Sequence, residues 1–149
     1  MTIACIGDWE FFVPDGWALM DNDAGVSYIE APDGAAGMYV KCIELSSPKA
    51  TGRDLANYLQ QTHKDSFEDL DGANWISVDR RDVPGEHLHR SAMDLLDHGK
   101  SYRVLSLVAC DLQSAIQVIV HDYLCEDYEA TRGRFSEIEH SIQRATPTG

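Results

Sequence analysis

One stretch, residues 102–124, limits the folds open to this chain more than any other. It holds two apolar, β-rich runs, Tyr102–Cys110 and Ser114–Leu124, separated by three residues, which is the spacing of a β-hairpin. At every second position, both runs place apolar side chains on one face and again on the other. Such strands lie inside a sheet that is covered on both sides, so we expect a central hairpin with other elements packed above and below it.

The residues before this hairpin predict further short antiparallel strands. Strands are expected at residues 9–13, 26–31, 38–45, 75–79 and 87–96. The first two are each followed by a Pro-Asp-Gly turn, at residues 14–16 and 32–34. Proline and glycine supply the backbone angles that tight turns need, so the early strands form a meander.

Two amphipathic helices are predicted from apolar residues spaced three and four apart. The first follows Thr51, an N-cap residue with Asp54 in the capping-box position. Its expected inward stripe is Leu55, Tyr58, Leu59, Thr62, Ser66 and Leu70. The second helix opens with acidic residues, which suit a helix N-terminus, and ends before Pro147. Its expected inward stripe is Tyr128, Thr131, Phe135, Ile138, Ile142 and Ala145.

Length and element order together predict the architecture. A chain of 149 residues is one domain by the usual prior, so residues 1–149 are treated as a single unit. The order of strands, helix, strands and helix predicts an α+β fold, in which an antiparallel β-sheet is sandwiched by two main helices.

The charge balance restricts the partners. Twenty-five acidic residues against 12 basic ones give a net charge of −13, which makes nucleic acid a poor direct partner. A basic protein would be attracted and its association accelerated, although a simple solubilising role explains the same charge. No apolar run is long enough to cross a bilayer, and the first residues do not read as a signal peptide. We therefore expect a cytoplasmic protein without membrane insertion.

Two acidic groups are the candidate partner-binding residues. The first contains Glu68, Asp69 and Asp71, and the second contains Asp122, Glu126, Asp127 and Glu129. Together they could dock a basic target, such as the active-site cleft of a nuclease-like toxin. The alternative interpretation for each group is a solvated helix end.

The histidine and acidic motifs do not predict a metal site. Residues 21–25 resemble the start of a calcium loop, but Gly and Glu are missing from its sixth and twelfth places. His87 and His89 share one strand face, yet the sequence supplies no third ligand. Glu137 and His140 have the spacing found in di-iron proteins, which need that motif twice. No metal and no cofactor are predicted.

The cysteines are expected to be free thiols. Cys5, Cys42, Cys110 and Cys125 are widely spread and form no Cys-x-x-Cys motif. Cys125 precedes a helix, which can activate a thiol, but neighbouring acidic residues oppose that effect. No phosphate-binding loop or nucleophile elbow is present, so no catalytic residue is predicted.

Short structural motifs at both ends resemble a known superfamily. They are Phe11-Phe12-Val13-Pro14-Asp15-Gly16-Trp17 at the start and Tyr128…Arg132…Phe135-Ser136-Glu137-Ile138…Ser141-Ile142 at the end. With the early meander, the middle helix and the long hairpin, they are similar to the PsbP/Mog-like superfamily. That family includes photosystem subunits, a Ran-binding nuclear factor, bacterial lipoproteins and cytosolic adaptors of secreted toxins. The resemblance implies an α/β/α fold and a non-enzymatic, protein-binding role, and the cytosolic bacterial toxin-associated branch fits best.

Three functions follow as hypotheses. The first is an immunity protein that binds and neutralises a cognate bacterial secreted toxin. The second is a chaperone or adaptor for a type VI-secreted effector, working as a homodimer with an exposed apolar surface. The third is a small enzyme of unknown type, for which the sequence offers His87, His89 and Cys125 as starting points.

Overall fold

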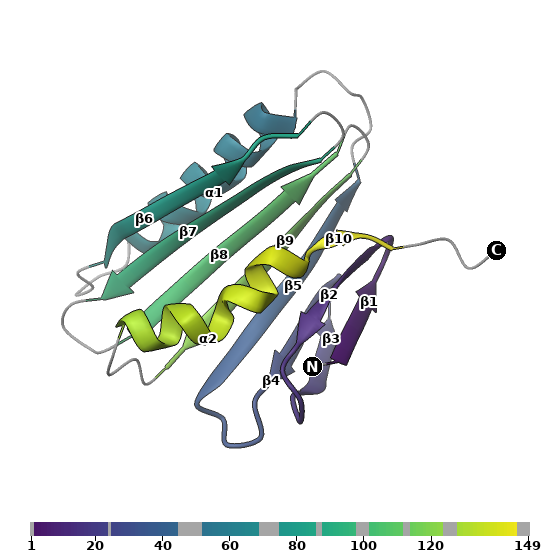
Figure 1. Cartoon of the computed structure of the whole chain (residues 1–149), viewed down its shortest axis with the longest axis vertical. Coiled ribbons are helices and arrows are strands. Elements are labelled where there is room, and N and C mark those ends of the chain that lie inside the picture. Colours follow the sequence, from purple (N-terminus) through teal and green to yellow (C-terminus); the bar gives the residue numbers. More distant parts are fainter. Residues whose placement is uncertain are drawn as a thin grey trace.

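The computed structural model describes residues 2–23, 25–44, 52–68, 75–85, 88–97, 102–111, 114–123 and 128–145 (Figure 1). Its helices are α1 (Gly52–Glu68) and α2 (Tyr128–Ser141). Its strands are β1 (Thr2–Ile6), β2 (Trp9–Val13), β3 (Ala18–Asp23), β4 (Val26–Glu30), β5 (Ala36–Glu44), β6 (Trp75–Val83), β7 (His89–Asp97), β8 (Tyr102–Cys110), β9 (Ser114–Asp122) and β10 (Gln143–Arg144).

Seven strands form one antiparallel sheet in the order β3-β4-β5-β9-β8-β7-β6. The predicted hairpin is confirmed: β8 and β9 pair from Arg103 opposite Asp122 to Cys110 opposite Ala115. The hairpin lies in the interior of the sheet, between β5 and β7. A second sheet of three strands, in the order β1-β2-β10, joins the first strands of the chain to one of the last.

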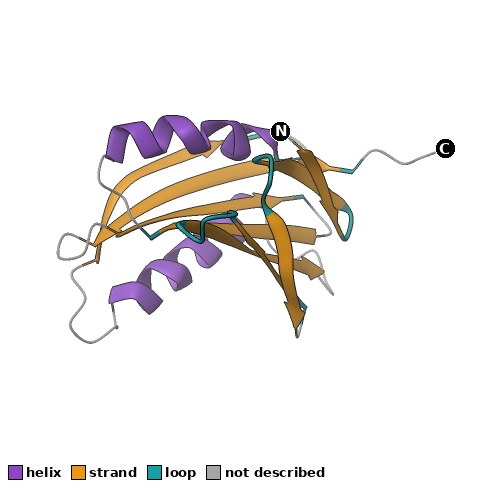
Figure 2. Cartoon of the chain, turned by 90° about the horizontal axis from the view of Figure 1, so that it is seen from below, coloured by secondary structure: helices purple, strands orange, loops and turns teal. Residues whose placement is uncertain are grey.

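The two helices lie on opposite sides of the large sheet (Figures 1 and 2). On one side α1 runs along β7 and β8. On the other side α2 lies beside β2 and shares the main core with the small sheet. The expected mainly antiparallel sheet with two helices is therefore present. On the α2 side, however, the large sheet is covered by the small sheet as well as by the helix. Neither helix has the length and apolar character that a membrane crossing requires.

Both predicted Pro-Asp-Gly turns are confirmed. Gly16 and Gly34 have φ angles of 86° and 71°, a region that glycine enters without the steric penalty of a side chain. The Trp17 amide donates to the Pro14 carbonyl, and the Asp33 carboxylate accepts from the Ala35 amide at 3.0 Å. These local bonds fix how the early strands leave each turn.

The inward face of α1 differs from the prediction. Tyr58 is 67% exposed, and Thr62 and Ser66 are exposed as well, whereas Ala56 and Gln60 are fully buried. The reason is hydrogen bonding, because the Gln60 amide finds partners on the sheet and can be buried without loss. The predicted N-cap Thr51 and the predicted stripe residue Leu70 lie outside the described residues.

The last helix is shorter than predicted. Phe135, Ile138 and Ile142 are buried in the main core as expected, but α2 ends at Ser141. The chain then becomes extended, and Gln143 and Arg144 pair with β2. Strands β1 and β3, which the sequence did not predict, complete the two sheets.

Candidate partner-binding surface

Most of the predicted acidic residues cannot be placed. Asp69, Asp71, Glu126 and Asp127 lie outside the described residues, as does the side chain of Glu68. Glu129 is exposed in the first turn of α2.

Asp122 contradicts its prediction as a surface acid, because it is 3% exposed. It stands opposite Arg103 in the β8–β9 register, on the side of the sheet that faces α2. Its strand position therefore points the carboxylate into the protein.

The predicted histidine and cysteine candidates are held in structural roles where they are described. His89 is buried, with its Nε2 atom 3.4 Å from Asp82, and His140 Nδ1 bonds the Ser136 carbonyl at 2.8 Å. Among the described residues, no group of three His, Cys, Asp or Glu side chains could hold a metal ion. His87 and Cys125 lie outside those residues.

The thiols of Cys42 and Cys110, which are half-buried and buried respectively, are not activated. Burial raises the pKa of Cys42, and it raises the pKa of Cys110 to about 12. Both thiols stay protonated near neutral pH, and a protonated thiol is a poor nucleophile.

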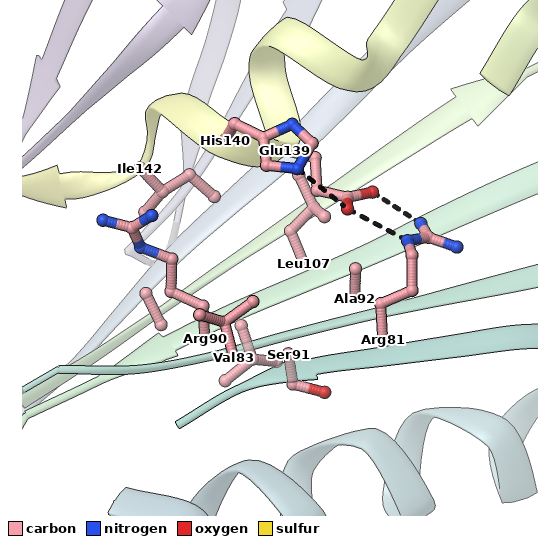
Figure 3. A pocket seen from close by; sticks show the side chains of 11 residues that line it. Arg81, Val83, Arg90, Ser91, Ala92, Leu107, Glu139, His140 and Ile142 are labelled. Atoms are coloured by element: carbon pink, nitrogen blue, oxygen red, sulfur yellow. Dashed lines mark hydrogen bonds and ion pairs between the residues drawn. The ribbon is translucent and has the colours of Figure 1, made fainter. Parts of the chain in front are cut away.

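A group of charged side chains fastens α2 to the large sheet (Figure 3). Arg81 donates two hydrogen bonds to Glu139, at 2.9 and 2.5 Å, and one to Asp94, at 2.7 Å. Arg103 also donates to Asp94 at 2.9 Å. We call these four residues, Arg81, Asp94, Arg103 and Glu139, the α2 clamp. The hydrogen bonds to Glu139 and to Asp94 raise the pKa of Arg81, so this guanidinium is charged at any ordinary pH.

A small cavity lies beside the clamp, beneath the end of α2 (Figure 3). It has a volume of about 30 Å³, and its lining includes Val83, Ala92, Leu107 and Ile142, with Arg90 and His140 among its polar residues. Such a volume holds about two water molecules. The cavity is too small for an organic substrate, so the clamp is better explained as a structural fastening.

The most distinctive surface lies on the opposite side of the sheet, beside α1. Five aromatic and imidazole side chains from four neighbouring strands meet there. They are Tyr28 of β4, Tyr39 of β5, Tyr102 of β8, and His121 and Tyr123 at the end of β9. We call this set the tyrosine–histidine face. Strand alternation places it on the same side as Ser106, which contacts α1.

The rings of this face form a continuous chain of contacts. Tyr28 and Tyr39 have centroids 4.6 Å apart, and Tyr39 meets His121 edge to face at 5.3 Å. His121 stacks on Tyr123 at 5.7 Å, and Tyr123 meets Tyr102 at 5.4 Å. Contacts of this geometry each contribute about 0.5–1.5 kcal/mol beyond burial, so the rings support one another's orientation.

Hydrogen bonds also fix four of these rings, those of Tyr28, Tyr102, His121 and Tyr123, from their polar ends. The hydroxyls of Tyr28 and Tyr123 are 3.2 Å apart, and the Tyr102 hydroxyl lies 2.6 Å from His121 Nδ1. Burial, with a smaller contribution from nearby His63 of α1, lowers the pKa of His121 to about 4. Burial also raises the pKa of Tyr102 to about 12. At neutral pH the Tyr102 hydroxyl therefore shares a hydrogen bond with an uncharged imidazole.

The backbone is adapted to this face at Gly37. A Cβ atom at this position of β5 would lie 2.7 Å from Tyr28 Cε2, which is closer than real contacts allow. Glycine therefore lets the Tyr28 ring rest on the strand and reach Tyr123. This dependence on one glycine shows that the ring arrangement is built into the sheet.

These features suit binding better than proton transfer. A pKa of about 4 makes His121 a weak base near neutral pH, and general bases work best when their pKa is near the working pH. The ring of Tyr39 is 40% exposed, so the face is open to a partner. Tyrosine is among the residues that dominate binding energy in protein interfaces.

The sequence carried only part of this signal. Tyr102, His121 and Tyr123 fall on the same side of the predicted hairpin, since each occupies an alternate position of its strand. Tyr28 and Tyr39 join them only through the pairing of β5 with β9, which the sequence pattern does not specify.

Comparison with known proteins identifies the fold. No family profile and no curated protein sequence matches the chain. Among solved structures, cyanobacterial PsbP (CyanoP) from Synechocystis sp. PCC 6803 is similar, with a TM-score of 0.67 and 16% sequence identity. The match covers 92% of this chain and 86% of that one. The likeness concerns the fold alone, and on that evidence the chain has a PsbP-like fold.

Proposed function

We propose that this chain is a non-catalytic protein-binding module, and specifically an immunity protein that binds and neutralises a cognate bacterial secreted toxin. The observation that carries the proposal is the tyrosine–histidine face, a set of mutually supported rings with Tyr39 open to solvent. Rigid aromatic side chains bind partners at low entropic cost because few of their rotatable bonds remain to be fixed.

The charge of the chain supports a basic partner. A net charge of −13 attracts a positively charged toxin domain and speeds its association at low ionic strength. In this proposal the protein acts in the cytoplasm, where it meets the toxin before or after secretion. Glu129, together with the acidic residues outside the described ranges, adds to the attraction.

Affinity capture from the source organism tests this function. The tagged chain should recover a basic protein in stoichiometric amount, identified by mass spectrometry. The purified pair should associate more slowly as salt rises, because screening weakens long-range attraction. Co-expression should also protect cells from that partner's toxicity. Recovery of no stoichiometric partner, or of one whose toxicity persists on co-expression, would count against an immunity role.

A chaperone or adaptor for a type VI-secreted effector is the second candidate. It is favoured by apolar side chains on the surface: Ile3 is 56% exposed and lies opposite Phe12, which is 38% exposed. Leu19 and Met20, each 61% exposed, lie on the edge strand β3. A chaperone would bind apolar segments of its client through such residues, and its binding would resist salt. The salt dependence of the captured complex therefore separates the two candidates.

A further inference from the structure

We propose that the tyrosine–histidine face holds an arginine-bearing segment of the partner protein, with the guanidinium group lying against the tyrosine rings. This inference rests on the proposed function and adds the chemistry of the contact. A guanidinium is planar and weakly hydrated, and it stacks on aromatic faces more readily than an ammonium group does.

The face is prepared for such a group before binding. Tyr28 and Tyr123 are joined through their hydroxyls, and Tyr102 is joined to His121. The rings therefore keep their orientation without a ligand. A partner that settles on them has little side-chain freedom left to remove, which preserves binding energy.

Charge decides which kind of partner segment this aromatic surface binds. His121 is uncharged near neutral pH because burial lowers its pKa to about 4. The rings thus offer the negative faces of their π systems without a cation of their own. An acidic segment would be repelled by a chain of net charge −13, and so would a second copy of this chain. A cationic segment is favoured by both the rings and the net charge.

Two charged residues border the face on the same side of the sheet. Glu30 follows Tyr28 by two residues on β4, and Lys41 follows Tyr39 by two residues on β5. Glu30 pairs with Gly37, beside the Tyr28 ring, while Lys41 pairs with Val26 at the far end of β4. Because Gly37 also pairs with His121, Glu30 lies in the cross-strand row at the middle of the face, whereas Lys41 lies in the row beyond Tyr39, opposite Val26 and Gln117. We expect Glu30 to strengthen binding and Lys41 to weaken it.

A titration followed by NMR tests the contact directly. The probe is a blocked peptide of sequence Gly-Arg-Gly-Arg-Gly, compared with peptides that carry Glu or Leu in place of Arg. The arginine peptide should shift the resonances of Tyr39 and His121 and leave those of Tyr58 unchanged. Tyr58 lies on α1, is 67% exposed, and serves as the control tyrosine. Shifts spread over the whole acidic surface, or a tighter fit of the leucine peptide, would overturn the proposal.

Three variants sharpen the test. Tyr39→Ala should weaken arginine-peptide binding roughly threefold, in line with a cation–π contact at an open site. Glu30→Gln should weaken it and Lys41→Ala should strengthen it, each by roughly twofold. Tyr58→Ala should have no effect. Equal affinities of the Tyr39→Ala and Tyr58→Ala variants for the arginine peptide would refute the contact. If Tyr39→Ala does not fold, titration of the same peptide into Glu30→Gln gives a second measure of binding.

Failure of this inference is distinguishable from failure of the proposed function. If the chain captures and neutralises a basic partner, and Tyr39→Ala captures it equally well, the function stands and the arginine contact is wrong. If no partner is captured while the arginine peptide still binds the rings, the contact stands and the immunity role is wrong.

Discussion

Gln60 and Ser106 exchange two hydrogen bonds between α1 and β8. The Gln60 side-chain amide donates to the Ser106 carbonyl at 3.0 Å, and the Ser106 hydroxyl donates to Gln60 Oε1 at 2.8 Å. Both residues are fully buried. A buried pair of this kind sets the position of the helix along the strand, because any shift leaves polar atoms without partners.

Replacing Gln60 should therefore destabilise the protein. Gln60→Leu removes both bonds and leaves the Ser106 groups buried, so the free energy of unfolding should fall by about 2 kcal/mol. Urea denaturation measures the change. Gln61→Leu is the control, because Gln61 is exposed and bonds only to Asp65 one turn away in the described structure. If both variants lose a similar amount of unfolding free energy, the buried hydrogen bonds do not contribute more than an exposed one.

The α2 clamp predicts strong coupling between two charged residues. Arg81→Leu removes a positive partner from two carboxylates, Glu139 and the fully buried Asp94. The free energy of unfolding should therefore fall by about 3 kcal/mol. The double variant Arg81→Leu/Glu139→Leu should recover part of that loss. Arg80→Leu is the matched control, since Arg80 pairs with Asp82 at the surface. If the double variant instead loses as much stability as Arg81→Leu and Glu139→Leu lose in sum, the two residues are not coupled and the clamp is wrong.

Gly37 and Gly133 should respond oppositely to the same substitution. Gly37→Ala places a methyl group against Tyr28 and should destabilise the protein by about 1–3 kcal/mol. It should also shift the NMR signals of Tyr28 and Tyr123. Gly133 lies exposed in α2 with open space around it, so Gly133→Ala should stabilise by about 1 kcal/mol. Thermal unfolding of the two variants compares the signs, and a neutral Gly37→Ala would show that Tyr28 can move without loss.

Two half-buried histidines predict a loss of stability in mild acid. Burial lowers the pKa of His63 and of His121 to about 4, from 6.5 in the unfolded chain. The unfolded state therefore binds more protons between these values, so stability is full above pH 6.5 and falls as the pH drops toward 4. Each pKa unit corresponds to about 1.4 kcal/mol, so the two shifts together set an upper limit on the order of 6 kcal/mol for the loss by pH 4.

The pH dependence can be assigned to these residues by substitution. His121→Gln should remove roughly half of the fall between pH 6.5 and 4, because His63 remains. His140→Gln should not reduce it, because the His140 side chain is 71% exposed. Carboxylates affect the stability at lower pH than these histidines do. The hydrogen bond from Arg81 lowers the pKa of Asp79, and its contribution is lost only below pH 4. If the stability of His121→Gln depends on pH as that of the parent protein does, the assignment is wrong.

The sequence predicted the elements that have a strict hydrophobic period. The β8–β9 hairpin was predictable because both of its faces are apolar, and the turns at Gly16 and Gly34 because their residues suit few other conformations. Both helices were also predicted, although the inward face of α1 was not. A pattern based on apolar residues could not anticipate that Gln60 would be buried, because its partners lie 31 and 46 residues further along the chain.

The candidate site was less predictable than the fold. The acidic residues that the sequence favoured lie mainly outside the described ranges, and Asp122 is buried for a reason of strand register. The tyrosine–histidine face depends on β5 pairing with β9, which brings together residues about 80 positions apart. Single-sequence periodicity indicates which faces of a strand are apolar and carries no information about which strands become neighbours.

The pairing of β10 with β2 has a consequence for biosynthesis. Trp9 lies under the Arg144 guanidinium, which is 5.3 Å from the ring centroid, and Arg144 is among the last described residues to be made. During translation the amino-terminal hairpin is made long before β10, so the indole lacks this cover until residues 143–144 have left the ribosome. A nascent chain stalled before Gln143 would therefore expose this tryptophan to chaperones, and the pairing of Gln143 and Arg144 with β2 would end that exposure.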